Sequence, residues 1–282
     1  MSAALFENRK LLIVTKHGKE AVLAPKLEKA LGVRCIAASS FDTDTLGTFS
    51  GETERPGDAL TVLRTKCRSG MQLEGYDLAL ASEGSFGAHP TIFFATADEE
   101  LLMLIDTKNN LEITSRVISL ETNFNATVIH NRSELEKFLE LCKFPSHAVL
   151  LKKSPYDCTD MVKGIHDHST LYEVYERLKD KEGAVYIETD MRAIHNPSRM
   201  HVIGQAADKL IEKIASCCPE CACPGFGMTS ATAGLPCAAC GHPTKSTLYH
   251  TYCCQKCLHA EKKWYPRGII KEEPEYCDLC NP

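Results

Sequence analysis

The sequence predicts an α/β protein: a mixed sheet in α/β/α layers, followed by a small zinc-ribbon-like module. Two observations support this. Short apolar strands alternate with helical patterns along residues 1–215, and four Cys-x-x-Cys pairs gather in residues 216–282. A hairpin expected at Thr107–Asn110 makes the sheet mixed rather than purely parallel. We therefore expect two domains, an α/β domain at 1–215 and a metal module at 216–282.

The first element along the chain is a buried strand at Leu11–Val14. A polar turn, Thr15–Glu20, follows it and leads into a helix that stops at Gly32. This turn brings His17 and Lys19 to a helix N-terminus, where anions are favoured, so both are candidates for binding an anionic ligand. An ordinary βα connection that merely happens to be basic explains the same residues.

The next segments are a strand at Val33–Ala38, a loop-rich stretch at Phe41–Asp58 and a helix from Ala59. A strand at Asp77–Ala81 then runs into a connection that contains Glu83 and Gly84. α/β proteins place ligand sites at such strand ends, which makes Glu83 a candidate site residue. The alternative is a glycine-rich connection with one solvated carboxylate.

The second half repeats the alternation of strands and helices. The pairs Ser133/Glu136 and Thr170/Glu173 fit capping boxes and predict two helix starts. Asn196 and Pro197 fit the cap and first position of a long helix. Before it, a strand at Ala184–Glu188 leads into a charged junction that contains Asp190, Arg192 and Arg199. This junction is either a ligand site, with Asp190 and Arg192 as ligand-binding residues, or a structural ion-pair network.

The ends of the strands at Leu11–Val14, Leu78–Ala81 and Ala184–Ile187 are expected to converge on one cleft. The cations and carboxylates that follow these strands suit a phosphorylated small molecule or nucleotide, bridged by Mg²⁺. If the turns instead lie at separate points, their charges are simply solvated.

The cysteine pairs have the spacing of four-cysteine zinc sites. The first two pairs are fifteen residues apart, and the last two are nineteen residues apart. Two cysteines in one tight turn direct both thiolates at one ion, and a second turn completes a tetrahedron. We expect two structural zinc ions bound by Cys218, Cys221, Cys237, Cys240, Cys254, Cys257, Cys277 and Cys280.

Several alternatives stay open for this module. The two sites can form from neighbouring Cys-x-x-Cys pairs in sequence or from interleaved pairs. Catalytic zinc and dithiol redox chemistry are the alternatives to structural zinc. Disulfides are disfavoured because the total of fifteen cysteines is odd and no secretory signal precedes them. Trp264, the one tryptophan, is expected in the core or on a docking surface. Ligand assignment is complicated by spare thiols and imidazoles at Cys217, Cys223, Cys253, His242, His250 and His259.

Composition narrows the setting and the partners. Hydrophobic residues make up 44% and charged residues 24%, as in ordinary globular proteins. No apolar run reaches the ~18 residues of a membrane span, so no membrane association and a cytoplasmic location are expected. Net charge is −5, and residues 216–282 hold six Lys/Arg against six Asp/Glu, which argues against nucleic acid as a partner.

Six phrases along the chain together resemble one bacterial family of uncharacterised proteins. The resemblance covers nearly the whole chain and names a domain of unknown function, so it implies no activity. The phrases are Thr15–Glu20, Leu46–Gly51, Leu80–Gly87, Glu188–Ala193, Asn196–Pro197 and Cys277–Pro282.

The N-terminal half is also similar in layout to the inosine/xanthosine triphosphate pyrophosphatases. Thr15, His17 and Lys19 stand near that family's first motif, although its asparagine is His17 here. Ser50–Gly51, Arg55–Pro56 and Glu83–Gly84 stand at the later motifs, and Thr61 falls near an expected acidic position. The resemblance implies Mg²⁺-assisted attack of water on a nucleotide, with Lys19 holding phosphate and Glu83 holding metal or activating water.

Two functions therefore follow from the sequence. The first is a Mg²⁺-dependent nucleotide or phosphate-ester hydrolase that also carries structural zinc. The second is a non-catalytic ligand-binding or scaffold protein whose zinc module contacts a protein partner.

Overall fold

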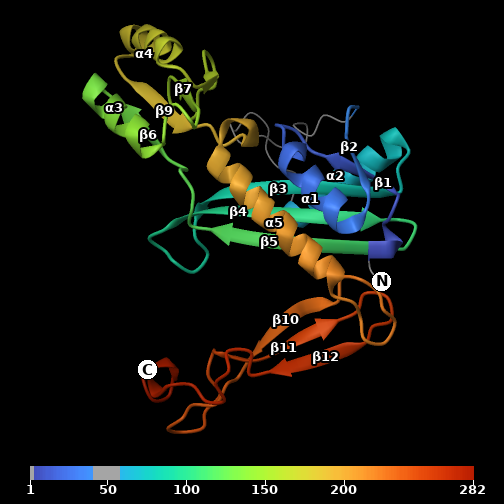
Figure 1. Ribbon diagram of the computed structural model, residues 1–282. Coiled ribbons are helices and arrows are strands. Elements are labelled where there is room, and N and C mark those ends of the chain that lie inside the picture. Colours follow the sequence, from blue (N-terminus) through green and yellow to red (C-terminus); the bar gives the residue numbers. More distant parts are fainter. Residues whose placement is uncertain (1–2, 41–57) are drawn as a thin grey trace. The chain divides into compact units, whose positions relative to one another are not determined.

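The chain forms two compact units, which are described separately below. The computed structural model describes residues 3–40 and 58–282, so most of the loop expected at Phe41–Asp58, with Ser50, Gly51, Arg55 and Pro56, lies outside the described residues. The α/β unit is Glu7–Leu210, and the cysteine unit is Ile211–Pro282 together with Met1–Phe6 (Figure 1). Among the described helices, none is both long and apolar enough to cross a bilayer.

The α/β unit contains a five-stranded mixed sheet in the order β2-β1-β3-β4-β5. β1 pairs in parallel with β2 and β3, whereas β4 pairs antiparallel with both β3 and β5, so the predicted mixed sheet is confirmed. The hairpin expected at Thr107–Asn110 joins β4 to β5. The strands are β1 (Lys10–Val14), β2 (Arg34–Ala37), β3 (Leu78–Ala88), β4 (Thr96–Asp106) and β5 (Leu111–Ser119).

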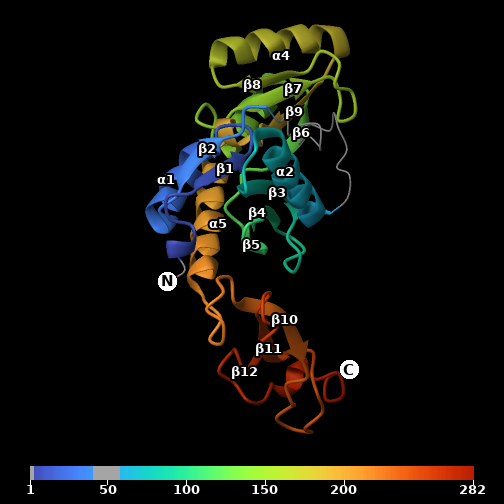
Figure 2. The same cartoon turned by 90° about the vertical axis from the view of Figure 1, so that its right-hand side faces the viewer.

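Two helices cover opposite faces of this sheet (Figure 2). α1 (Glu20–Leu31) connects β1 to β2 and ends where expected, at Gly32, whose φ of 64° suits glycine. α2 (Ala59–Glu74) is capped by the carboxylate of Asp58, which accepts from the N–H groups of Leu60 and Thr61. The buried face of α2 packs on apolar side chains of β1, β3 and β4.

β3 is longer than the sequence indicated. The segment from Ser82 to Ala88 was expected to be a connection, but it continues the strand and pairs residue by residue with the start of β4. The residues of this glycine-containing stretch do not themselves favour a strand. Pairing with β4 satisfies the hydrogen-bonding groups of its backbone, and this holds it in the strand. Glu83 and Gly84 therefore lie inside a sheet rather than in a loop.

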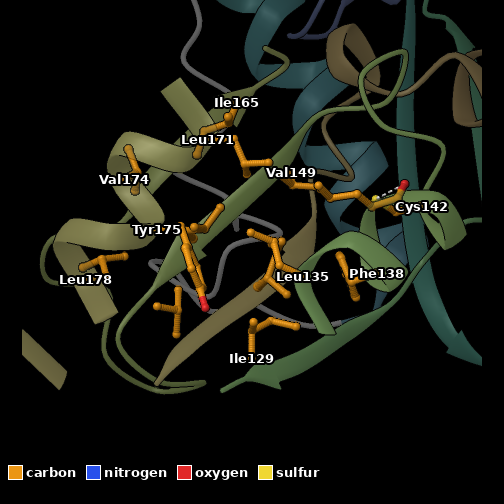
Figure 3. Packing of buried hydrophobic residues seen from close by; sticks show 14 residues of the cluster. Ile129, Leu135, Phe138, Cys142, Val149, Ile165, Leu171, Val174, Tyr175 and Leu178 are labelled. Carbon is orange, nitrogen blue, oxygen red and sulfur yellow. Dashed lines mark hydrogen bonds between the residues drawn. The ribbon is translucent and has the colours of Figure 1, made fainter. Parts of the chain in front are cut away.

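A second, four-stranded sheet has the antiparallel order β6-β9-β7-β8. The strand expected at Ala184–Glu188 is β9 (Val185–Thr189), so it belongs to this sheet and not to the one that holds β1 and β3. Two helices pack on the sheet around a separate apolar core that includes Tyr175 and Phe138 (Figure 3). The other elements are β6 (Ala126–Ile129), α3 (Arg132–Leu141), β7 (Val149–Lys152), β8 (Val162–Ile165) and α4 (His168–Glu182).

The helix starts of the second half lie earlier than predicted. Asn131 caps α3 by accepting from Glu134 N, and Asp167 caps α4 by accepting from Thr170 N. Each helix therefore begins ahead of its expected capping box, because the earlier residue also carries an oxygen that can accept. The cap of α5 (Pro197–Ala215) is as predicted, since Asn196 Oδ1 accepts from Arg199 N.

The cysteine unit contains a three-stranded antiparallel sheet in the order β10-β11-β12. Its strands are β10 (Gly227–Ala233), β11 (Thr247–Cys253) and β12 (Ala260–Trp264). The strands are short and partly exposed, and the few apolar side chains buried in the unit besides its cysteines include Ile214, Phe226 and Leu235. A unit of this kind has little apolar core of its own and needs another source of stability.

Gly70 on α2 gives a test of this packing. A Cβ atom at this position would lie 2.7 Å from Val14 Cγ2 and 3.3 Å from Leu12 Cδ2. We expect Gly70→Ala to lower the melting temperature, because overpacking costs ~1–3 kcal/mol and exceeds the ~1 kcal/mol gained in helix propensity. Thr65→Ala on the exposed face of α2 is the control and should leave the melting temperature unchanged or higher. A rise with Gly70→Ala would contradict this packing.

Candidate functional site

The eight paired cysteines form two groups, and their pairing is interleaved. The first and third pairs converge, as do the second and fourth, so the sequential alternative is excluded in this structure. Within each group, all four Sγ atoms lie within 4.8 Å of one another. The groups are Cys218/Cys221/Cys254/Cys257, called cluster A, and Cys237/Cys240/Cys277/Cys280, called cluster B.

Each pair has the same local backbone. The N–H group four residues after the first cysteine donates to that cysteine's carbonyl, for example from Gly241 to Cys237. The residue after the second cysteine adopts a left-handed conformation in three of the four turns, namely Ala222, Gly241 and Leu258. This tight turn directs both Sγ atoms of a pair to one side, which is what a metal site needs.

The spare thiols do not belong to either cluster. Cys223 Sγ contacts the carbonyl of Pro224, and Cys253 Sγ contacts that of Cys254. All fifteen cysteines are described, and none of them forms a disulfide. Trp264 lies on the surface, 52% exposed, with its ring 4.7 Å from that of Tyr249, so the core alternative for Trp264 is wrong.

The α/β unit has a second candidate site, a buried group of charges on one face of the five-stranded sheet. Lys19 Nζ donates to Ser82 Oγ at 2.9 Å, and Arg199 Nε donates to Glu100 Oε1 at 2.6 Å. Residues two apart on a strand share a face, so Ser82 and Gly84 lie on the same side of β3. A Cβ atom on Gly84 would lie 2.5 Å from Glu100 Oε1, so the ion pair requires glycine there. We call Lys19, Ser82, Asp98, Glu100 and Arg199 the buried charge cluster.

Glu83 projects to the opposite face, where α2 lies. Lys66 Nζ is 2.5 Å from Glu83 Oε2, and both residues are buried. Ser82 and Glu83 are adjacent on β3, just beyond the residue that pairs with the end of β1. The predicted site residues Lys19 and Glu83 are therefore brought to the same end of β1, with their side chains on the two faces of the sheet.

Burial shifts two members of the charge cluster toward neutrality. It lowers the pKa of Lys19 to about 7, helped by repulsion from Arg199 and opposed by Glu100. Burial and the neighbouring Glu100 raise the pKa of Asp98 to about 8, against the attraction of Arg199 and Lys19. Groups that titrate near neutral pH in a buried cluster are typical of functional sites.

The turn between β1 and α1 adopts an uncommon backbone conformation. His17 and Gly18 are consecutive left-handed residues, with φ of 67° and 72°. A left-handed histidine costs free energy and is found where surrounding structure imposes it. A Cβ atom on Gly18 would lie 3.8 Å from Ile194, so the turn lies against the short 3-10 helix Ala193–His195.

Asp190 and Arg192 form a compact pair next to that helix. Asp190 Oδ2 accepts from Gly164 N at 3.0 Å and lies 2.5 Å from Arg192 NH2. Burial alone would raise the pKa of Asp190, but its hydrogen bonds to Arg192 outweigh burial and lower it. Both carboxylate oxygens of Asp190 accept hydrogen bonds from nearby protein groups. This is the geometry expected if the junction is a structural ion-pair network rather than a ligand site. Arg199, expected in the same group, instead pairs with Glu100.

Lys66, Asp98 and Glu100 were not predicted as site residues. Asp98 and Glu100 alternate along β4 in phase with Leu102 and Leu104, which are fully buried. Extending the period-two pattern back from Leu102 would have placed both carboxylates on a buried face. Lys66 lies on the buried face of α2, between Leu63 and Gly70.

These features define an α/β protein with two four-cysteine clusters that could hold metal ions and a buried charge cluster at the end of its first strand. Residues 66–282 match the family described as domain of unknown function DUF6671, and the chain belongs to that family. The match includes both cysteine clusters, Asp98, Glu100 and Arg199, and begins after Lys19. A comparison with curated proteins gives no match.

Proposed function

We propose that clusters A and B each bind one structural zinc ion. Two Sγ–Sγ distances in cluster A are 3.6 Å, and two in cluster B are 3.7 and 3.8 Å. Four sulfurs placed ~2.3 Å from a central zinc lie ~3.8 Å apart, so the groups fit the ion. Four thiolates close the coordination shell, which favours a structural role over a catalytic one.

The interleaved pairing makes a stoichiometric prediction. Purified reduced protein should contain about two zinc ions per chain. Cys221→Ser with Cys257→Ser removes two ligands from cluster A, so about one zinc should remain. Cys221→Ser with Cys240→Ser removes one ligand from each cluster and should lower both occupancies. Elemental analysis after dialysis measures this. A larger loss of zinc in Cys221→Ser with Cys257→Ser than in Cys221→Ser with Cys240→Ser would refute interleaved binding.

For the α/β unit, we propose a Mg²⁺-dependent hydrolase that acts on a phosphorylated small molecule or nucleotide. The observation that carries this proposal is Lys19. Its side chain is buried, and within the described part of the chain its ammonium has one hydrogen-bond partner, Ser82, and no ion pair. A buried cation without a counter-charge is costly, and an anionic ligand would relieve that cost.

The location of Lys19 favours phosphate as that anion. Lys19 is the N-cap residue of α1, and no side chain caps the helix there. The dipole of a helix N-terminus favours an anion, and the lysine adds a full charge. The N–H groups of Ala21 and Val22 already donate to the carbonyls of Gly18 and Lys19, so the dipole and the ammonium carry this argument. The left-handed turn at His17 and Gly18 leads directly into this helix start, so His17 would lie beside the ligand.

Hydrolysis requires groups that assist water and hold the metal ion. Mg²⁺ prefers oxygen ligands and usually combines one or two carboxylates with phosphate oxygens. Among residues 3–40 and 58–282, no three carboxylate or imidazole groups converge, so the ligand phosphate would complete such a site. When bound, Mg²⁺ would neutralise charge on the phosphate as water attacks. Glu83 is the carboxylate that the sequence predicts for this reaction. Because it lies on the face opposite Lys19 and pairs with Lys66, variants at this position must separate catalysis from structure.

Removing the Lys19 charge should separate ligand binding from stability. Lys19→Met should weaken binding of ATP by about 10- to 100-fold, the equivalent of one charge-assisted hydrogen bond of ~1.5–3 kcal/mol. It should also raise the melting temperature of the ligand-free protein, because an unpaired buried cation is removed. Calorimetric titration and thermal unfolding measure the two effects.

The pH dependence supplies the control for this variant. The pKa of Lys19 is lowered to about 7, so its charged form, which binds the anion, declines as the pH rises above 7. ATP affinity should therefore fall more steeply with rising pH in the unsubstituted protein than in Lys19→Met, where only the ionisation of Asp98 still adds negative charge to the cluster. Equal affinity and equal pH profiles for the two proteins would rule out Lys19 as the phosphate-binding residue.

The role of Glu83 needs a variant pair, because Glu83→Gln alone leaves Lys66 buried and unpaired. Losing one partner of a buried ion pair costs ~3–5 kcal/mol, whereas removing both charges is close to neutral. We expect Glu83→Gln to lower the melting temperature and Glu83→Gln with Lys66→Met to restore it. Mg²⁺-dependent release of phosphate, measured on a nucleotide panel, should be lost in both. A folded double variant with full turnover would show that Glu83 is structural.

The second candidate is a non-catalytic protein whose cysteine unit contacts a partner. The observation that favours it is the exposed Trp264, which packs on the half-buried Tyr249, with Lys262 Nζ 4.5 Å from the centre of the Tyr249 ring. Exposed aromatic side chains of this kind are enriched at protein interfaces. ATP binding without turnover by the Mg²⁺-loaded protein would favour this candidate over the hydrolase.

A further inference from the structure

Two carboxylates of the buried charge cluster have oxygen atoms that nothing satisfies. Asp98 is 1% exposed, and Glu100 is fully buried. Within the described residues, Asp98 Oδ1, Asp98 Oδ2 and Glu100 Oε2 have no hydrogen-bond partner. Buried polar atoms are almost always hydrogen-bonded, so three acceptors on neighbouring side chains require an explanation.

The two carboxylates project to the same side of the sheet. Asp98 and Glu100 are two residues apart on β4, whose pairing with β3 and β5 is regular over this stretch. Glu100 lies opposite Gly84, and Asp98 lies opposite Phe86. Glu99, between them, projects to the other face, where Arg116 Nε lies 2.5 Å from its Oε1.

The cations of the cluster do not satisfy these atoms. Arg199 Nε donates to the other oxygen of Glu100, Oε1, and Arg199 NH1 donates to the carbonyl of Met191. Lys19 donates to Ser82 of β3, which pairs with Leu102 of β4 and not with Asp98. When both carboxylates are ionised, all three atoms are acceptors, so the missing group must bring a positive charge or hydrogen-bond donors.

We propose that Asp98 and Glu100 are ligands of a divalent cation with a preference for oxygen, Mg²⁺ or Mn²⁺. One oxygen of Asp98 and Glu100 Oε2 supply the protein ligands. Water supplies the remaining positions, as is usual for these ions. Two carboxylates on one strand are a sparse metal site, which suits an ion that also contacts a bound substrate.

The charges connect this site to the proposed phosphate site, and only this step rests on the proposed function. Asp98 and Glu100 carry two negative charges when ionised, and Lys19 and Arg199 carry two positive charges. A divalent cation leaves two uncompensated positive charges in a buried place, which a phosphate dianion would neutralise. Same-face residues on a strand are ~7 Å apart, close enough for one phosphorylated ligand to contact both Lys19 and the cation. Cation and phosphate should therefore each strengthen the binding of the other.

The test is Mn²⁺ binding to the full-length, zinc-loaded chain, measured by the electron paramagnetic resonance signal of free Mn²⁺ without phosphate. Asp98→Asn keeps the shape of the side chain and removes its charge, and should weaken Mn²⁺ binding by at least tenfold. Glu99→Gln is the matched control, because it removes a carboxylate between the two ligands on the opposite face. It should leave Mn²⁺ binding unchanged. Equal Mn²⁺ affinity in Asp98→Asn and the unsubstituted protein, or no bound Mn²⁺ in either, would overturn the proposal.

Thermal unfolding separates a metal ligand from a structural residue. In the absence of divalent cation, Asp98→Asn should leave the melting temperature unchanged or higher, since a buried unsatisfied carboxylate is removed. Mn²⁺ should raise the melting temperature of the unsubstituted protein and of Glu99→Gln, but not of Asp98→Asn. A lower melting temperature for Asp98→Asn without cation would show a structural role and contradict the proposal.

Lys19→Met keeps this proposal distinct from the phosphate site. Without phosphate, Lys19→Met should bind Mn²⁺ at least as tightly as the unsubstituted protein, because a nearby positive charge is removed. Pyrophosphate should tighten Mn²⁺ binding in the unsubstituted protein and much less in Lys19→Met. Mn²⁺ binding without any effect of pyrophosphate would reject the phosphate site and keep the cation site. Pyrophosphate binding by a protein that binds no Mn²⁺ would reject the cation site and keep the phosphate site.

Discussion

The buried ion pair between Arg199 and Glu100 connects the parts of the α/β unit. Arg199 belongs to the first turn of α5, and its partner Glu100 belongs to the five-stranded sheet. Arg199 also donates to the carbonyl of Met191, which lies in the segment that leaves the second sheet. One guanidinium thereby joins three elements that are distant in sequence. The pair is fully buried, so losing either partner would leave an uncompensated charge. The pair also requires glycine at position 84, because a side chain there would overlap with the carboxylate of Glu100 and the guanidinium of Arg199.

Stability has different sources in the two units. The α/β unit buries apolar side chains around both of its sheets, and those cores can offset the free energy that a buried charge cluster costs. The cysteine unit has short strands with partly exposed residues, and its most buried side chains include the first cysteine of each pair. Interleaving means that each cluster ties together two distant turns, so either ion would restrict most of the unit. Folding and metal binding are expected to be one process there.

The sequence was most informative where one local rule decides the structure. The Cys-x-x-Cys turns, the Asn196–Pro197 helix start, the stop at Gly32 and the hairpin at 107–110 each depend on a few adjacent residues. The pairing of the cysteine turns could not be predicted, because both orders satisfy the same spacing. The extension of β3 to Ala88 could not be predicted either, since it depends on the partner strand β4 and not on its own glycine-containing sequence.

The charge cluster shows the same limit for the site. Lys19 and Glu83 were identified because each stands near a strand end, but their projection to opposite faces follows from Ser82 and Glu83 being neighbours within a strand. Once β3 continues through Glu83, period two separates these side chains, and the face that holds Lys19 receives its carboxylates from β4 instead. Of the carboxylates that attract the Lys19 ammonium, Glu100 has the largest effect on the pKa of Lys19. The extension of β3 beyond Ala81 therefore decides which carboxylates are available to a ligand held by Lys19, and this is why Asp98 and Glu100 carry the inference about the cation.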